Sequence, residues 1–131
     1  MKSCRKSAHF LICIVLVVAV AGTAYAADIE SGIWLQTSST AGDCADCSIE
    51  VTLLTPHVIG IDASNGWMGF AYYVSDQDEY RGFMELKPFS EGSPDDWLNK
   101  VFTIRLVLEK MTLNLEGSTT GIEFAATFRK E

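Results

Sequence analysis

Residues 100–128 read KVFTIRLVLEKMTLNLEGSTTGIEFAATF, and this stretch decides the fold class. Between Lys100 and Glu109 the apolar residues fall on every second position, opposite Thr103, Arg105 and Glu109. The same alternation runs through Lys110–Glu116 and again from Ile122 to Phe128. A period of two is typical of a β-strand with one buried face. The stretch therefore predicts three consecutive strands and no helix.

Five earlier segments show the same short apolar runs, separated by turn residues. Strands are predicted over Glu30–Thr37, Ser48–Thr55, His57–Ala63, Trp67–Ser75 and Tyr80–Lys87. The irregular stretch Phe89–Asn99 offers one helical turn at most. Because the connections are short, sequence neighbours are expected to pair antiparallel. The chain is predicted to be all-β, with about eight strands in a small up-and-down barrel or a two-sheet sandwich. Closure removes exposed strand edges and favours the barrel.

The N-terminal segment has the pattern of a secretory signal peptide. Three basic residues among the first six are followed by the apolar run Phe10–Ala21 and by Ala24-Tyr25-Ala26, a small-x-small cleavage site. The run is short for a membrane span. Cleavage after Ala26 would leave residues 27–131 as one domain, exported to the periplasm or the extracellular space.

The mature chain is strongly acidic. Loss of residues 1–26 removes three of the ten basic residues and none of the 17 acidic ones, which leaves a net charge of −10. This charge argues against a nucleic-acid partner and favours a basic protein. The acidic segments Asp43–Asp46, Asp76–Glu79 and Glu91–Asp96 would supply contacts. No second hydrophobic segment predicts a membrane span.

Signals for catalysis and for metal binding are weak. The sequence lacks a Gly-x-Ser-x-Gly elbow, a His-Glu-x-x-His pair and a phosphate-binding glycine loop. His57 is the only histidine of the mature chain, and no nucleophile stands beside it. The acidic turn Asp76–Glu79 lacks the glycine and the distal glutamate of a calcium loop. We therefore expect no enzymatic activity, no cofactor and no metal.

Cys44 and Cys47 are the two cysteines of the mature chain. In an oxidising compartment they are expected to form a local disulfide that shapes its loop. Thioredoxin-type redox chemistry would need a helix after Cys44, whereas Ser48–Leu53 has the pattern of a strand. Covalent haem would need a histidine where Ser48 stands. A zinc site would need His57, carboxylates or a second chain in addition. The redox and zinc interpretations remain open alternatives to the disulfide.

The two ends of the mature chain resemble the lipocalins and their calycin relatives. Gly32-Ile33-Trp34 matches the Gly-x-Trp pattern near the first strand of that superfamily, and Arg129 follows Phe128 at the end of the last strand. The resemblance implies a barrel in which Trp34 closes one end and Arg129 packs across it, both as structural residues. The chain is shorter than a typical lipocalin. It also lacks the helix beside the barrel and the helical lid of the fatty-acid-binding branch, so a large lipid cavity is not implied.

Aromatic residues on both faces of two adjacent strands, Trp67–Ser75 and Tyr80–Lys87, are the main binding candidates. One face must pack the core, and the other is predicted to form an aromatic surface on the outside of the barrel. Cross-strand pairing that only stabilises the sheet is the alternative interpretation. The candidate binding residues are Trp67, Tyr73, Tyr80, Phe83, Asp95 and Asp96.

The predicted interior is bulky, which favours a packed barrel over an open cup. The residues expected to face inward are Ile49, Val51, Met68, Phe70, Phe102, Ile104, Leu106, Leu113 and Phe124. Two functions follow from these observations. The first is an exported barrel that binds a small apolar ligand. The second is an acidic protein-binding module, such as an inhibitor of a basic secreted enzyme or a partner in envelope assembly.

Overall fold

The computed structural model describes residues 29–42, 44–87 and 97–131, and it confirms the all-β prediction. The predicted binding residues Asp95 and Asp96 lie outside these ranges. The strands are β1 (Gly32–Ser39), β2 (Ser48–Thr55), β3 (Val58–Ala63), β4 (Trp67–Val74), β5 (Glu79–Leu86), β6 (Val101–Glu109), β7 (Thr112–Thr119) and β8 (Ile122–Lys130).

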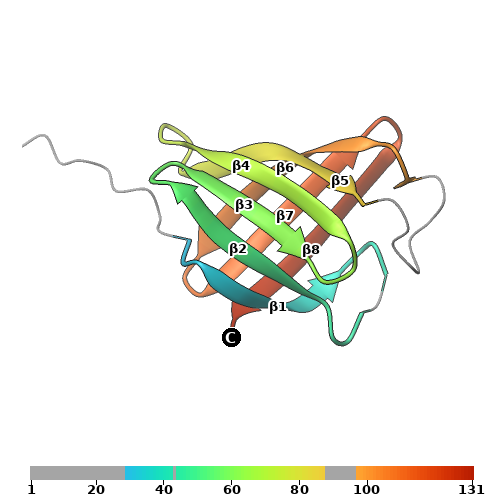
Figure 1. Ribbon diagram of the computed structural model, residues 1–131, viewed down its shortest axis with the longest axis horizontal. Coiled ribbons are helices and arrows are strands. Elements are labelled where there is room, and N and C mark those ends of the chain that lie inside the picture. The colour runs from blue at the N-terminus through green and yellow to red at the C-terminus, as the bar shows by residue number, and fades with distance from the viewer. Residues whose placement is uncertain (1–28, 43, 88–96) are drawn as a thin grey trace, which may run out of the picture.

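All eight strands belong to one closed antiparallel barrel in which each strand pairs with its sequence neighbours (Figure 1). The barrel closes between β1 and β8, where Trp34 pairs with Lys130 and Leu35 with Arg129. The register shifts between Gln36 and Ser38, so a bulge interrupts this closing pair. Closure satisfies the backbone groups that the two edges of an open sheet would expose. The fold is therefore the barrel rather than the two-sheet sandwich.

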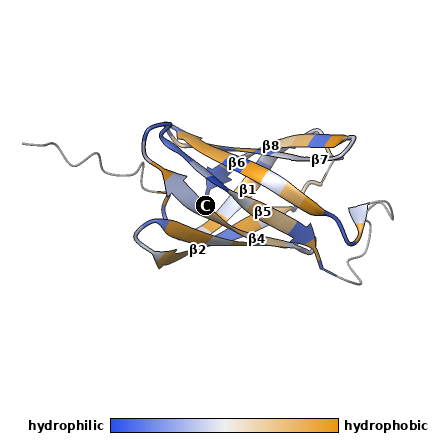
Figure 2. Ribbon diagram, turned by 90° about the horizontal axis from the view of Figure 1, so that it is seen from above, coloured by the Kyte–Doolittle hydropathy of each residue, from blue (hydrophilic) through white to orange (hydrophobic). Residues whose placement is uncertain are grey.

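Hydrophobic and hydrophilic residues alternate along the strands (Figure 2). Their burial alternates as well, so that one set of side chains lies inside the barrel. Side chains from every strand fill the interior, as expected for an eight-stranded barrel of this kind. The largest fully buried side chains are those of Val51, Ile59, Phe102, Leu106 and Leu113.

The prediction that Met68 and Phe70 face inward is wrong. Their side chains lie on the outer face of β4, with 40% and 49% of their surface exposed. The inner face of β4 carries Trp67 and Ala71, and Gly69 lies between them. A side chain at Gly69 would collide with the backbone of β5, because an added Cβ would lie 2.1 Å from the carbonyl oxygen of Phe83. Both faces of β4 are hydrophobic, so hydrophobicity does not show which face points inward. The limited space inside the barrel decides it, because the face with the smaller residues fits there.

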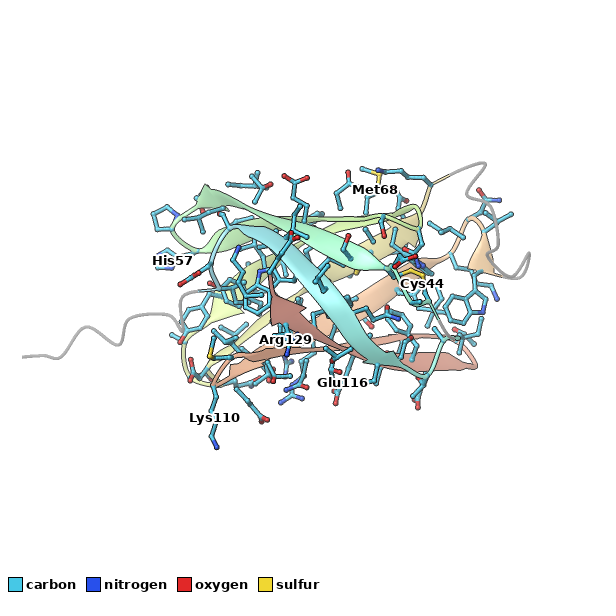
Figure 3. The ribbon with its side chains drawn as sticks, turned by 90° about the horizontal axis from the view of Figure 1, so that it is seen from below. Cys44, His57, Met68, Lys110, Glu116 and Arg129 are labelled. Atoms are coloured by element: carbon cyan, nitrogen blue, oxygen red, sulfur yellow. A yellow bond between two sulfur atoms is a disulfide. The ribbon has the colours of Figure 1, made fainter. Side chains whose placement is uncertain are left out.

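One end of the barrel, the Trp34 end, is closed by Trp34 itself. This side chain is 2% exposed, and its indole Nε1 donates a hydrogen bond to the carbonyl oxygen of Glu30 at 3.0 Å. The cation over the ring is Lys130, whose Nζ lies 5.9 Å from the ring centroid. Arg129, expected in this role, lies on the exposed outer face, because adjacent strand residues point to opposite sides. Figure 3 shows the turn residues His57 and Lys110 at this same end.

The opposite end, the disulfide end, carries the bonded pair Cys44–Cys47 (Figure 3). The Cα atoms of the two cysteines are 5.3 Å apart. Four aromatic rings close the barrel beneath it, and each contacts the other three with centroid separations between 5.1 and 5.9 Å. They belong to Trp67, Trp97, Phe102 and Phe124. Tryptophan side chains therefore close both ends of the barrel, Trp34 at one end and Trp67 and Trp97 at the other.

Within the described part of the chain, no helix has the length and apolar character that a membrane-spanning helix requires.

Candidate functional site

The structure divides the predicted binding residues between the core and the surface. Trp67 and Tyr80 are buried, and Tyr73 is half-buried with its ring 5.3 Å from that of Tyr80. The prediction that these three form an outer surface is wrong, because the register pairs Tyr73 with Tyr80 on the inner face. Phe83 does lie on the outer face, with 45% of its surface exposed.

Five exposed hydrophobic residues lie close together on the outer wall over β2 to β5 and form what we call the outer apolar patch. Phe70 pairs with Phe83 across β4 and β5, and their rings meet edge to face at 6.1 Å. On the β3 side, Phe70 pairs with Gly60. The side chain of Leu54 lies over Gly60, because a Cβ built on Gly60 would lie 3.5 Å from a methyl carbon of Leu54. The patch consists of Leu54, Met68, Phe70, Tyr72 and Phe83, each between 40% and 58% exposed.

Acidic residues border the patch at its Met68 side. Met68 pairs with Asp62 on β3 and with Glu85 on β5, and Glu50 pairs with Asp62 in turn. Lys87 offsets part of this charge, because its Nζ lies 2.8 Å from a carboxylate oxygen of Asp62. Three carboxylates against one ammonium leave this border net negative.

A groove of about 930 Å³ crosses the outer wall and shares Tyr72 and Phe83 with the patch, and we call it the cross-strand groove. Its floor is the row of paired residues Gly82, Ile104, Gly117 and Phe124. The side chains of Ile104 and Phe124 point inward, and the two glycines have none. The two neighbouring rows point outward and form its walls. One wall carries Tyr72, Arg81, Arg105, Glu116 and Ala125, and the other carries Phe83, Thr103, Ser118 and Glu123.

The first wall is fixed by an ion-pair cluster centred on Glu79. The carboxylate of Glu79 accepts a hydrogen bond from Arg81 Nε at 2.6 Å and another from Arg105 Nε. Arg105 Nη1 also lies 3.2 Å from a carboxylate oxygen of Glu116. Glu79 is 3% exposed although its strand position faces outward, because the two arginines cover it. Their own side chains remain 49% and 46% exposed, so their outer nitrogens reach the groove.

This cluster keeps Glu79 ionised. Burial alone raises the pKa of Glu79, but the hydrogen bonds and positive charges of Arg105 and Arg81 outweigh burial and hold it below the usual 4.5. The hydrogen bond to Glu79 raises the pKa of the Arg105 guanidinium in turn. The two arginines therefore favour the charged form of Glu79 at this wall of the groove.

The disulfide end of the barrel offers far less room than the groove. A cavity at the disulfide end has a volume of about 50 Å³, and its lining includes Trp67, Trp97 and Met84. Polar side chains, among them Gln36 and Asn65, line it as well. This volume holds one or two water molecules. A drug-sized ligand needs roughly 300 Å³ or more.

The sequence carries signals for the groove residues, but the same signals also fit other structures. Glu79 belongs to the acidic run that predicts a solvated turn, yet it is the first residue of β5. The alternation of Arg105 with apolar residues on β6 marks an outward arginine. Only the pairing of Arg81 with Arg105 brings these three residues together, and this pairing joins segments 24 residues apart.

Within the described ranges, no group of three or more metal-binding side chains is close enough together to hold a metal ion. His57 lies exposed in the turn between β2 and β3. The disulfide also occupies both thiols that the zinc interpretation requires.

In comparisons with protein-family models, with curated proteins and with solved structures the chain gives no match, which neither supports nor contradicts the lipocalin resemblance.

Proposed function

We propose that the mature protein is an exported, non-catalytic binding module that docks a basic protein surface on the outer apolar patch. The observation that carries the proposal is the position of Met68, Phe70, Tyr72 and Phe83 outside a barrel whose interior is already filled. Contiguous exposed aromatic residues cost solvation free energy in an isolated protein and are typical of interaction surfaces.

The negative charge around the patch indicates that the partner is positively charged. The carboxylates of Glu50, Asp62 and Glu85 border the patch, and the mature chain has a net charge of −10 once residues 1–26 are removed. A basic partner would be steered toward this face and held by apolar contact at its centre. An inhibitor of a basic secreted enzyme and an envelope-assembly partner both fit this description.

Export to the periplasm or the extracellular space is part of the proposal. Its support is the signal-peptide pattern of residues 1–26 together with the Cys44–Cys47 disulfide, which is compatible with an oxidising compartment.

Site-specific photo-crosslinking in the native host tests the proposal. A benzophenone amino acid replaces Phe70 in one variant and Arg129 in the control, which lies on β8, four strands away around the barrel. We expect position 70 to give an adduct with a basic protein and position 129 to give none. Roughly 1 M salt, which shortens the screening length to about 3 Å, should weaken the adduct without abolishing it, because salt does not screen the apolar contact. Equal adducts at both positions, or none at position 70, would overturn the proposal.

A small apolar ligand is the second candidate, and the 50 Å³ cavity beside Trp97 is the observation in its favour. Because this cavity is too small for such a ligand, Trp97 would have to move out of the aromatic cluster. Replacement of Trp97 by alanine would then tighten the binding of a hydrophobic dye, whereas binding at the outer patch would be unchanged.

A further inference from the structure

We propose that the cross-strand groove is a second binding site and that it takes a neutral, polyhydroxylated chain, that is, an oligosaccharide. The groove has the dimensions of a ligand site: about 930 Å³, across five neighbouring strands from β4 to β8. Four strand spacings give it a length of roughly 19 Å. An elongated ligand fits this shape better than a compact one.

The hydrogen-bonding groups of the groove are held in place before any ligand arrives. Both arginines direct Nε to Glu79, so their outer nitrogens are presented at fixed positions. On the opposite wall, Thr103 Oγ1 donates to the carbonyl oxygen of Ser118 at 3.1 Å and lies 3.3 Å from Ser118 Oγ. A site that is already ordered loses little conformational entropy on binding.

The groove offers both hydrogen-bond donors and hydrogen-bond acceptors along its walls. Guanidinium groups only donate hydrogen bonds, carboxylates only accept them, and the hydroxyls of Thr103 and Ser118 do both. Along the first wall Arg81 and Arg105 are followed by Glu116, which is 61% exposed. A sugar hydroxyl can accept from an arginine and donate to a carboxylate at the same time. Tyr72 and Phe83, at the β4 and β5 end, supply ring faces for the C–H side of a sugar.

The charge of the groove argues for a neutral ligand. Two arginines stand against the three carboxylates of Glu79, Glu116 and Glu123, so the groups nearly cancel. An anionic ligand would be attracted by the arginines but repelled by the carboxylates, and the reverse holds for a cationic ligand. Neither would gain much net attraction.

The topology argues against an extended peptide. Peptides that bind to sheets commonly add a strand to an open edge. This barrel is closed, and the groove runs across the strands with its floor already paired. A peptide lying there would find no row of unpaired backbone groups.

The test is titration of the mature protein with neutral linear hexasaccharides, followed by backbone amide NMR shifts. The probes are the β-1,4-linked glucose, α-1,4-linked glucose and N-acetylglucosamine hexamers, with hexaglutamate and hexalysine as charged comparisons. We expect at least one neutral hexamer to shift the amides of Gly82, Ile104 and Gly117.

Two variants on the same strand localise the binding. Ser118→Trp would fill the groove, and its matched control Thr112→Trp lies on the outer face of β7 outside the groove. Both positions are exposed, so both variants should fold. We expect Ser118→Trp to weaken hexasaccharide binding at least tenfold and Thr112→Trp to leave it unchanged.

Three results would overturn the proposal: no groove shift with any neutral hexamer at about 10 mM, equal binding by Ser118→Trp, or preferential binding of a charged peptide there. At that concentration, even millimolar affinity gives near saturation. Phe70 does not line the groove and Ser118 is not part of the outer apolar patch. Failure of this proposal is therefore distinguishable from failure of the protein-binding proposal.

Discussion

Glu79 shows how a single residue can take a role opposite to the one its neighbours suggest. It stands in the run Asp76-Gln77-Asp78-Glu79, which predicts a solvated turn. The turn does form, with Asp78 at a φ of 50°, but Glu79 begins β5 and lies beneath two arginines. Arg105 comes from β6, so no local pattern around Glu79 could have revealed the contact. The ion pair follows from strand register alone.

Lowering the pH should weaken the fold through Glu79. Its folded-state pKa lies below the usual 4.5, so its contribution is fully present above about pH 4.5 and is lost as pH falls through the lower value of the folded protein. Glu79→Gln should lower the free energy of unfolding at neutral pH by about 1–3 kcal/mol and flatten its acid dependence. Denaturant unfolding between pH 7 and pH 3 measures both effects. Glu50→Gln, at an exposed outer position, is the control; an equal response from both variants would contradict the assignment.

Lys130 and Arg129 lie on opposite faces of β8, so their replacement by alanine should lower the free energy of unfolding by different amounts. Lys130 lies over the Trp34 ring and donates from Nζ to the carbonyl oxygen of Ser31 at 2.7 Å, whereas Arg129 points outward. Lys130→Ala should therefore cost about 1 kcal/mol, and Arg129→Ala less than about 0.5 kcal/mol. Thermal unfolding of the two variants gives the comparison. The reverse order would restore Arg129 to the role that the lipocalin resemblance implies.

At the scale of the element, β4 and β5 show why the outer surface was harder to predict than the strands. The alternation on β6 is clear, and Phe102, Ile104 and Leu106 are buried as predicted. Both faces of β4 carry aromatic rings, so the pattern leaves two assignments of equal hydrophobicity. Steric limits decide between them, since an added Cβ at Gly69 or at Gly82 would collide with the backbone of the neighbouring strand.

Glycine substitutions on neighbouring strands test this steric account. A Cβ at Gly82 would lie 1.8 Å from the carbonyl oxygen of Phe70, whereas a Cβ at Gly60 would make ordinary contact with Leu54 at 3.5 Å. Gly82→Ala should lower the free energy of unfolding by about 1–3 kcal/mol, and Gly60→Ala should be close to neutral. Chemical denaturation of both variants is the measurement. A neutral Gly82→Ala would mean that β4 and β5 are not packed as described.

For the whole molecule, local patterns predict the eight strands and their neighbour pairing, but they do not reach the closing contact. The β1–β8 pair joins residues about 90 positions apart and includes a bulge at Gln36–Ser38. The sequence favours this closure only through the general cost of exposed edges and through the lipocalin resemblance. The groove was not predictable either, because it is a property of the curved outer wall and of three adjacent register rows. The central claim of the two proposals is that the molecule binds its partners on the outside of its barrel.

Native mass spectrometry of the protein purified from its own compartment tests this central claim most directly. We predict the mass of residues 27–131 with one disulfide and no retained small molecule, because the interior is filled by side chains and offers about 50 Å³. A stoichiometric apolar passenger that stays bound in the gas phase would contradict the claim and assign the binding function to the barrel interior.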